Sequence, residues 1–367
     1  MLFNQYTPLD EDCLKIPMKK IIHAITSLKV GGAETLLTQL APKLQDSGYQ
    51  ILILYFHTGP NVEKLEKAGV KVKKFNSAWQ FLNIVKDFKP DYIHSHLWYA
   101  NLLSCLAGFI FKIPVIHTVH GVSEKGSINT IDSKESFIRW FLDKLFLRVP
   151  EKYILVSKRM EVPFVKNHGF IPAKKIQFIP NGLELKNVKN EKAIFDEDCF
   201  VFGCIGRFIS IKRHADLIKA FVQVASKNSS VRLLLIGSGK EQPTLENLIE
   251  ELNMQDKVKI LFANNALGFY QQFDCYVTFS KELGMPVTLL EAMSFNVPVI
   301  LHEDNVEIFD GLEGLTKFKT FSEGVAAMER MALEKDLRKR LAQVGKRCLE
   351  QKFTIQRTVE EYKKLYK

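Results

Sequence analysis

Two carboxylates stand on either side of a turn that contains glycine and proline. The segment Ser280–Met293 reads S-K-E-L-G-M-P-V-T-L-L-E-A-M, with Glu282 before the turn and Glu291 in the apolar helical run after it. The turn follows Val277–Phe279, which is typical of the end of a buried strand. Ligands of α/β proteins bind where a strand ends and a helix begins, because helix N-termini offer N–H donors. Charged acceptors bind sugar or ribose hydroxyls strongly. The spacing therefore predicts a site for a polyhydroxylated ligand; the alternative is that both acids are helix caps or solvated side chains.

Two cations follow another apolar run, Phe200–Ile205. Gly206 and Arg207 come directly after this run, and Lys212 stands a few residues further on. An arginine fork and a lysine point charge at the end of a strand suit a diphosphate. The alternative is a pair of solvated surface cations.

A glycine pair opens the first helical run of the chain. Gly31 and Gly32 precede Ala33 and Glu34, after the apolar run Lys20–Ile25. Two residues without a Cβ let a ligand approach the backbone at a helix N-terminus, although a simple tight turn also explains them. The spacing is not G-x-G-x-x-G, which argues against a dinucleotide-binding fingerprint.

Four histidines end two further apolar runs, His94 and His96 in one and His117 and His120 in the next. We expect them to face the same edge of a sheet. No carboxylate stands at a matching spacing, so a metal site is not expected.

Alternating strands and helices must position these residues. In the first half, short apolar runs predict strands at Lys20–Ile25, Ile51–Phe56, Val70–Phe75, Asp91–His94, Val115–Thr118 and Tyr153–Val156. Helical periodicity predicts helices at Gly31–Leu44 and Val62–Ala68. Such alternation indicates a parallel sheet with helices on both faces.

The pattern restarts after the polar stretch Leu185–Asp198. Strands are predicted at Phe200–Ile205, Val231–Ile236, Val258–Phe262, Cys275–Phe279 and Val297–Leu301. Helices are predicted at Ala215–Val224, Thr244–Leu252 and, as a charged C-terminal run, Glu334–Tyr366. We therefore predict an α/β protein of two Rossmann-like domains that face each other across a cleft, residues 1–188 and 189–367. This assignment allows the last helix to pack back on the first domain.

Composition excludes several classes of protein. The chain has 367 residues, a length at which one hydrophobic core ordinarily splits into two domains. No apolar run approaches about 20 residues, so no membrane span is expected, and Met1–Pro17 has no basic segment typical of a signal peptide. The six cysteines form no C-x-x-C pair, which favours reduced, cytoplasmic thiols over zinc or disulfides.

Charge is unevenly distributed along the chain. Of the net charge of +10, residues 1–185 carry +8. A basic first half fits an anionic membrane surface or an anionic substrate. Nucleic acid is not expected, because no zinc-finger spacing, aromatic RNA-binding motif or basic helix accompanies the charge.

Taken together, the motifs resemble those of retaining glycosyltransferases of the GT-B fold in family four. The matching segments span residues 20 to about 350 and are GGAE (31–34), PDYIHSH (90–96), PVIHTVHG (114–121), VSKRM (156–160), IPNGLE (179–184), GRFISIKRH (206–214), LLIGSGKE (234–241) and GMPVTLLEAMSFNVPVI (284–300). Each segment is weak evidence alone, but the set is specific.

The resemblance implies roles in binding a nucleotide-sugar donor. Arg207 and Lys212, next to Gly206, would hold its diphosphate, and Glu291 would bind the ribose hydroxyls. Such enzymes need no metal or other cofactor, because the two cations stabilise the departing diphosphate.

The sugar and the acceptor would lie between the domains. The loop Gly284-Met285-Pro286 would offer backbone N–H groups to the donor sugar, and His120 would lie near its hydroxymethyl group. Gly31 and Gly32 would line the cleft. The transfer would retain the anomeric configuration through attack on the same face.

The chain departs from the family pattern at two places. The family has Glu-x7-Glu, with the first acid directly before the glycine, whereas Leu283 holds that place here and Glu282 lies one residue earlier. Either the loop slips so that Glu282 still contacts the sugar, or that contact is lost. The second departure is at residues 301–305, where LHEDN replaces a frequent glycine pair.

These features predict a cytoplasmic, peripheral enzyme on the inner face of the membrane. It would transfer a sugar to a glycan or lipid-linked acceptor in surface polysaccharide or glycolipid synthesis. Phe137–Arg148 suits a membrane interface or, equally, a buried helix. The alternatives are a non-catalytic nucleotide-sugar-binding partner of another transferase and a nucleotide-sugar epimerase; a nicotinamide dehydrogenase fits least.

Overall fold

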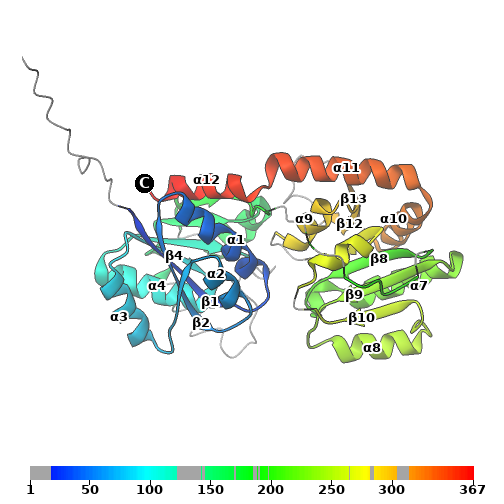
Figure 1. Cartoon of the computed structure of the whole chain (residues 1–367), viewed down its shortest axis with the longest axis horizontal. Coiled ribbons are helices and arrows are strands. Elements are labelled where there is room, and N and C mark those ends of the chain that lie inside the picture. The colour runs from blue at the N-terminus through cyan, green and yellow to red at the C-terminus, as the bar shows by residue number, and fades with distance from the viewer. Residues whose placement is uncertain are drawn as a thin grey trace, which may run out of the picture.

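The chain forms two parallel β-sheets, each covered by helices on both faces (Figure 1). The computed structural model describes residues 18–121, 142, 145–168, 171–184, 188, 191–196, 198–263, 265–281, 285–303 and 314–367. The predicted architecture of two Rossmann-like domains is confirmed.

The first sheet has the order β3-β2-β1-β4-β5-β6-β7. Its strands are β1 (Lys20–Ser27), β2 (Gln50–His57), β3 (Lys71–Lys74), β4 (Tyr92–His96), β5 (Val115–Val119), β6 (Lys152–Leu155) and β7 (Ile176–Phe178). The chain reverses its direction of winding between β1 and β4. Ligands of doubly wound sheets bind at the carboxyl ends of the strands at this kind of switch point.

The second sheet repeats the arrangement with the order β10-β9-β8-β11-β12-β13. Its strands are β8 (Phe200–Ile205), β9 (Val231–Ile236), β10 (Val258–Leu261), β11 (Cys275–Thr278), β12 (Val299–His302) and β13 (Leu315–Phe318). Here the switch point lies between β8 and β11, directly before the predicted basic and acidic segments.

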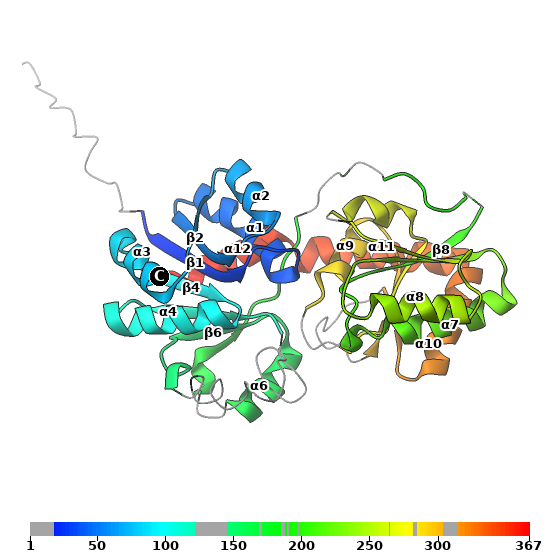
Figure 2. The ribbon, with the colours of Figure 1, turned by 90° about the horizontal axis from the view of Figure 1, so that it is seen from below.

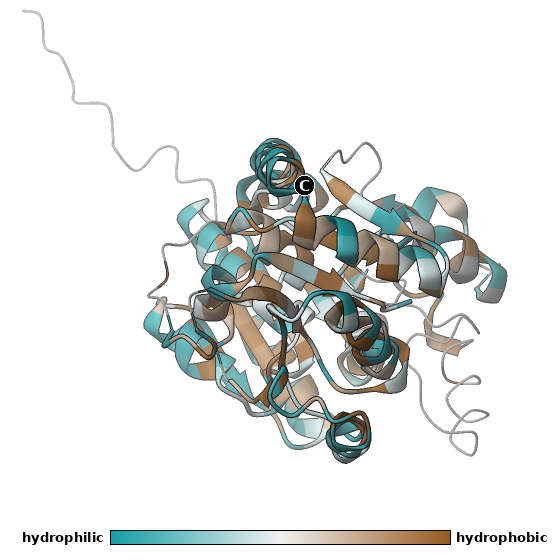
Figure 3. Cartoon of the chain, turned by 90° about the vertical axis from the view of Figure 1, so that its right-hand side faces the viewer, coloured by the Kyte–Doolittle hydropathy of each residue, from teal (hydrophilic) through white to brown (hydrophobic). Residues whose placement is uncertain are grey.

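The helices on the first sheet are α1 (Gly32–Asp46), α2 (Asn61–Lys67), α3 (Ala78–Phe88), α4 (Trp98–Phe111) and α6 (Glu161–Asn167). Leucines of α1 share one core with Ile21, Ile53 and Ile116, whereas α3 and α4 pack on the opposite face with Ile22 and Leu54. Figure 3 shows the resulting pattern of apolar strands and polar outer helix surfaces.

The helices on the second sheet are α7 (His214–Lys227), α8 (Gln242–Glu251), α9 (Val287–Ser294), α10 (Phe321–Leu333) and α11 (Lys335–Lys352). One of its cores contains Leu289 of α9, Leu349 of α11, and also Tyr153 and Leu155 of the first sheet. The apolar packing is therefore continuous from one domain to the other.

The last helix, α12 (Ile355–Leu365), packs on the first domain although α11 belongs to the second. Figure 2 shows α12 beside α1, which it contacts. The crossing is tight, because a Cβ on Gly182 would lie 2.2 Å from the carbonyl oxygen of Thr354. The C-terminal segment predicted to be helical, Glu334–Tyr366, is helical except at Phe353 and Thr354, where Leu183 bridges to Thr354 and separates α11 from α12.

Two strands were not predicted, β7 and β13. Both are only three or four residues long, lie at a sheet edge and are half-exposed over most of their length, so neither has a continuous apolar run. The predicted interfacial segment Phe137–Arg148 lies for the most part outside the described residues.

Candidate active site

The N-termini of α1 and α9 approach each other at the switch points of the two sheets. A Cβ built on Gly32, the first residue of α1, would lie 3.4 Å from Cγ2 of Val287, the first residue of α9. The first N–H groups of a helix lack partners within the helix and favour negative charge. Two such helix ends facing each other form an anion-attracting region between the domains.

Glu34, in the first turn of α1, is a charged side chain buried beside this region. Its carboxylate occupies the room that the missing side chain of Gly31 leaves, since a Cβ there would lie 2.4 Å from Glu34 Oε2. Burial raises the pKa of Glu34, and the Arg207 guanidinium and the Ser27 hydroxyl offset part of the rise. Arg207 of the second domain is therefore within electrostatic reach of the first.

The predicted basic pair lies at the carboxyl end of β8. The N–H of Gly206 donates to the carbonyl of Ile236 at 3.0 Å. Gly237 has a φ of +155°, and a Cβ there would lie 1.9 Å from the carbonyl oxygen of Gly206, so only glycine allows this approach. These contacts hold the backbone next to Arg207, whose side chain is exposed.

Lys212 ends a 3-10 helix (Ser210–Lys212) that follows Arg207, and its side chain is half-buried. Burial lowers the pKa of the neighbouring His214 to about 4, and the positive charge of Lys212 adds to that effect. Lys212 and Arg207 thus lie on one short loop before α7. Their binding of a diphosphate stays a prediction.

Glu291 lies in the second turn of α9 and is half-buried. The Tyr270 hydroxyl donates to Glu291 Oε2 at 2.8 Å. Burial raises the pKa of Glu291, while the Tyr270 hydrogen bond and the Lys64 ammonium of α2 offset part of the rise. Glu291 is therefore neither a helix cap nor a solvated side chain, which were the two alternatives to a ligand-binding role.

The loop before α9 contacts the connection between the domains. The N–H of Asn181 donates to Met285 Sδ at 3.2 Å, and both residues are buried. Pro286 precedes α9 and has no N–H, so the expectation that it donates to the sugar is wrong on chemical grounds. Glu282 and Gly284 lie outside the described residues.

The four predicted histidines lie at the carboxyl ends of the adjacent strands β4 and β5, as expected, but their side chains divide between the two faces of the sheet. His94 and His96 lie on one face of the sheet, where His96 Nε2 is 3.2 Å from His23 Nδ1. His117 points to the other face, with Nε2 3.4 Å from Cys105 Sγ. Alternate residues of a strand point to opposite faces, which explains the division. His120 follows β5, and its Nε2 lies 3.0 Å from His96 Nδ1.

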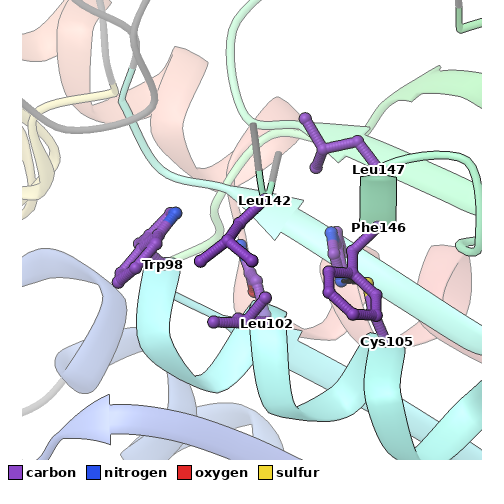
Figure 4. A pocket seen from close by; sticks show the side chains of 8 residues that line it. Trp98, Leu102, Cys105, Leu142, Phe146 and Leu147 are labelled. Carbon is purple, nitrogen blue, oxygen red and sulfur yellow. Dashed lines mark hydrogen bonds between the residues drawn. The ribbon is translucent and has the colours of Figure 1, made fainter. Parts of the chain in front are cut away.

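A small pocket lies beside His117, between α4 and the segment before β6 (Figure 4). Most of its lining is apolar, including Trp98, Leu102 and Phe146. Within the described part of the chain, His117 Nδ1 and Asn101 Oδ1 at this pocket are buried without hydrogen-bond partners.

Three residues of this region were not predicted: Glu34 as an interdomain charge, Lys64 and Tyr270. Tyr270 stands 21 positions before Glu291 in a 3-10 helix, and no periodicity joins them. Lys64 belongs to the other domain. Only the fold brings these groups together.

Two family sequence models match adjoining parts of the chain. Residues 30–187 match Glycosyltransferase Family 4, and residues 186–346 match Glycosyl transferases group 1. Together the two matches cover residues 30–346, so the chain belongs to the family-four type of glycosyltransferases, which combine these two parts.

Relatives of this glycosyltransferase include MJ1059 of Methanocaldococcus jannaschii, 28% identical over 62% of this chain and 59% of that protein. CapM of Staphylococcus aureus, a capsular polysaccharide biosynthesis glycosyltransferase, is 24% identical over 76% of this chain and 77% of its own. The fold is similar to the crystal structure of Anabaena HepE in complex with UDP and glucose, with a TM-score of 0.80. The two sequences are 18% identical, and the match covers 95% of this chain and 99% of the HepE chain. That likeness shows that the fold is GT-B.

Among the described residues, no helix is both long enough and apolar enough to cross a bilayer. The described ranges also contain no cluster of three or more histidine, cysteine or acidic residues arranged to hold a metal ion.

Proposed function

We propose that this glycosyltransferase transfers a sugar from a nucleotide-sugar donor with retention of the anomeric configuration, without a metal ion. The observation that carries the proposal is the approach of the N-termini of α1 and α9, with Arg207 within electrostatic reach of Glu34 in the first turn of α1 and the carboxylate of Glu291 oriented by Tyr270 in α9. Cations, helix N-termini and one buried acid are the groups that a diphosphate and a ribose require.

Glu291 is the ribose-binding residue in this proposal. The hydrogen bond from Tyr270 to Oε2 fixes the carboxylate, which leaves Oε1 to accept from the ribose hydroxyls. A carboxylate oriented before the ligand arrives loses less entropy on binding than a mobile one.

Arg207 and Lys212 bind the diphosphate and stabilise it as it departs. The bond between the anomeric carbon and the phosphate oxygen breaks, and the acceptor hydroxyl forms the new bond on the same face. The acceptor proton passes to the departing phosphate oxygen. Charge grows on the diphosphate during this step, so cations placed there accelerate it without a metal.

The acceptor is a glycan or lipid-linked sugar of surface polysaccharide or glycolipid synthesis. CapM supports the pathway class, and the UDP and glucose of HepE support a nucleotide-sugar donor. A membrane-bound acceptor also suits the exposed apolar side chains of the first domain, among them Phe109 at the end of α4 and Val162 on α6, which are 74% and 75% exposed. An excess of positive charge in the same half of the chain favours an anionic surface.

A panel of nucleotide sugars tests the proposal. The purified protein is incubated with UDP-, GDP- and ADP-sugars, with and without EDTA, and release of the nucleoside diphosphate is measured. We expect slow hydrolysis of one donor that EDTA does not change, and NMR of a transfer product should show the anomeric configuration of the donor. Loss of activity in EDTA would refute the metal-free mechanism. An isomerised nucleotide sugar formed without acceptor would identify an epimerase, and binding of donors without turnover would identify a non-catalytic partner.

A further inference from the structure

A continuous series of hydrogen bonds runs through the interior of the first domain and ends at His120. Its seven side chains come from β1, β4, β5, α12 and the residues that directly follow β5 and α12. We call them the histidine–tyrosine chain: His120, His96, His23, Tyr366, His94, Thr118 and Tyr362.

Every donor–acceptor distance in the histidine–tyrosine chain is 3.3 Å or less. From the His120 end, the six links are 3.0, 3.2, 3.3, 2.7, 2.7 and 3.0 Å long. Register explains the arrangement, because His23 of β1 lies beside His94 of β4, and Ile25 beside His96, so the imidazoles share one face of the sheet. The rings of His94 and His96 stack 4.9 Å apart at an angle of 2°.

The interior of this chain excludes water. His23, His94 and His96 are fully buried, and Thr118, Tyr362 and Tyr366 are at most 2% exposed. Burial lowers the pKa of His23 to about 3 and of His120 to about 4, so the imidazoles are neutral near pH 7. Each neutral imidazole then has one donor and one acceptor nitrogen.

The number of hydrogens determines in which direction the hydrogen bonds of the histidine–tyrosine chain run. Seven groups each supply one hydrogen, but only six links join them. One hydrogen therefore has no place within the chain and must lie at one of its ends, unless a buried hydroxyl in the middle is left unpaired. A buried donor without an acceptor is costly, so the hydrogen lies at the end where an acceptor can arrive.

The two ends differ in this respect. The Tyr362 hydroxyl has Thr118 as its hydrogen-bond partner and no other within the described residues, so it must donate to Thr118. Each following group in the histidine–tyrosine chain then also donates toward the His120 end. His120 Nδ1 is buried and has no partner in the described residues, and His120 lies at the carboxyl end of β5.

We propose that the histidine–tyrosine chain holds His120 in the Nδ1–H form, so that it presents a donor to an acceptor oxygen of the bound sugar, with Tyr366 as a positioning residue. The inference rests on the proposed function for the identity of the ligand, but not for the tautomers. A helix that follows the second domain in sequence thus sets the hydrogen-bonding character of a side chain in the first. His23, His94 and His96 have the same Nδ1–H form.

The tautomers can be read directly by NMR of the full-length protein labelled with ¹⁵N-histidine. Two-bond ¹H–¹⁵N spectra distinguish Nδ1–H from Nε2–H, and single substitutions such as His120→Asn and His96→Asn assign the signals among the nine histidines. We expect Nδ1–H at His23, His94, His96 and His120 without any ligand. Nε2–H at His23, His96 or His120 would overturn the proposal, whether or not the protein turns over a sugar.

Tyr366→Phe tests the positioning role, and Tyr49→Phe is its matched control. Tyr49 packs edge-on against Tyr366 with ring centroids 5.7 Å apart, but its hydroxyl is not part of the histidine–tyrosine chain. In Tyr366→Phe, His23 Nε2 loses its donor, so we expect Nε2–H signals to appear at His23, His96 and His120. We also expect kcat/KM for transfer to fall about tenfold, the effect of one hydrogen bond, while the Kd for UDP is unchanged. Tyr49→Phe should behave as wild type.

Wild-type tautomers and wild-type kcat/KM in Tyr366→Phe would overturn the positioning role. If that variant does not fold, the wild-type spectrum still decides the direction of the chain. If no nucleotide sugar is turned over, the proposed function fails while the spectrum still tests the tautomers.

Discussion

At the scale of single residues, the two cations after β8 carry the largest share of the proposed chemistry. Arg207 is exposed and Lys212 is half-buried on one short loop, so neither forms part of a core. We expect Arg207→Ala and Lys212→Ala each to lower kcat by about 10²–10³, as removal of one transition-state donor does. Thermal unfolding should be unchanged. The neighbouring Lys219→Ala, on the exposed surface of α7, is the control. Near-normal turnover in either variant would eliminate the proposed diphosphate site.

The two acids around the turn make a second prediction at this scale. Glu291→Ala should weaken binding of the bare nucleotide by roughly tenfold to a hundredfold, because it removes charge-assisted hydrogen bonds to the ribose. Glu282→Ala should spare nucleotide binding and reduce transfer, because a site built around a hydroxyl is impaired when that contact is lost. Calorimetric titration with UDP and assays with the full donor separate the two effects.

Leu283→Glu distinguishes the two interpretations of this loop. If Glu282 replaces the displaced family acid, Leu283→Glu brings no gain. A silent Glu282→Ala in an active enzyme, together with higher activity in Leu283→Glu, would refute the role of Glu282.

At the scale of elements, the crossing of the α11–α12 junction over Gly182 holds the C-terminal helix on the first domain. A Cβ at residue 182 would lie 2.2 Å from the Thr354 carbonyl oxygen and 2.6 Å from the Ile355 N atom, and both are backbone atoms that cannot rotate away. Gly182→Ala should therefore lower the free energy of unfolding by about 1–3 kcal/mol, the usual cost of overpacking. Urea denaturation measures the change. Gly121→Ala, where no atom of the described residues lies within 4 Å of the added Cβ, is the control, and equal stability of both variants would contradict the prediction.

At the scale of the whole molecule, the buried imidazoles predict a loss of stability in acid. The pKa is lowered to about 3 for His23 and His117 and to about 4 for His120 and His214. The unfolded chain binds protons at these groups near pH 6.5 while the folded protein does not, so the free energy of unfolding falls as the pH falls between about 6.5 and 4. Each histidine contributes about 1.4 kcal/mol per pH unit within this window.

Among the described residues, three carboxyl groups oppose this effect. Burial raises the pKa of Glu34, Asp274 and Glu291, so the folded protein binds their protons first and acid stabilises it through them. The histidines are more numerous, and we expect a net loss. Urea denaturation at pH 7.5, 6 and 5 measures it, and equal midpoints at the three values would show that the imidazoles do not control acid stability.

The uneven charge makes a further prediction for the molecule as a whole. Residues 1–185 carry +8 of the net +10, so association with anionic vesicles should exceed that with neutral ones at low salt. Attraction is worth about 1 kcal/mol per basic residue near the surface and is screened over roughly 10 Å at 0.1 M salt. Vesicle sedimentation across a salt series measures this. Equal binding to both kinds of vesicle would remove the electrostatic support for a lipid-linked acceptor.

The architecture follows from the sequence alone, as do the segments that are candidates for chemistry. Phe200–Ile205 and Val231–Ile236 were predicted at the bounds that β8 and β9 have, because central parallel strands are buried on both faces and read as continuous apolar runs. The glycines and cations after such runs lie at the carboxyl ends of strands by topology, so their approximate place followed as well.

Contacts between distant segments were decided only by the tertiary structure. The Tyr270–Glu291 hydrogen bond, the approach of Lys64 to Glu291 and the division of the histidines between two sheet faces depend on register and domain packing. The sequence predicts which side chains a strand buries, because periodicity is local. Which partner meets each buried polar group, and hence the tautomer of His120, depends on elements up to 343 residues apart in the chain that meet only when it folds.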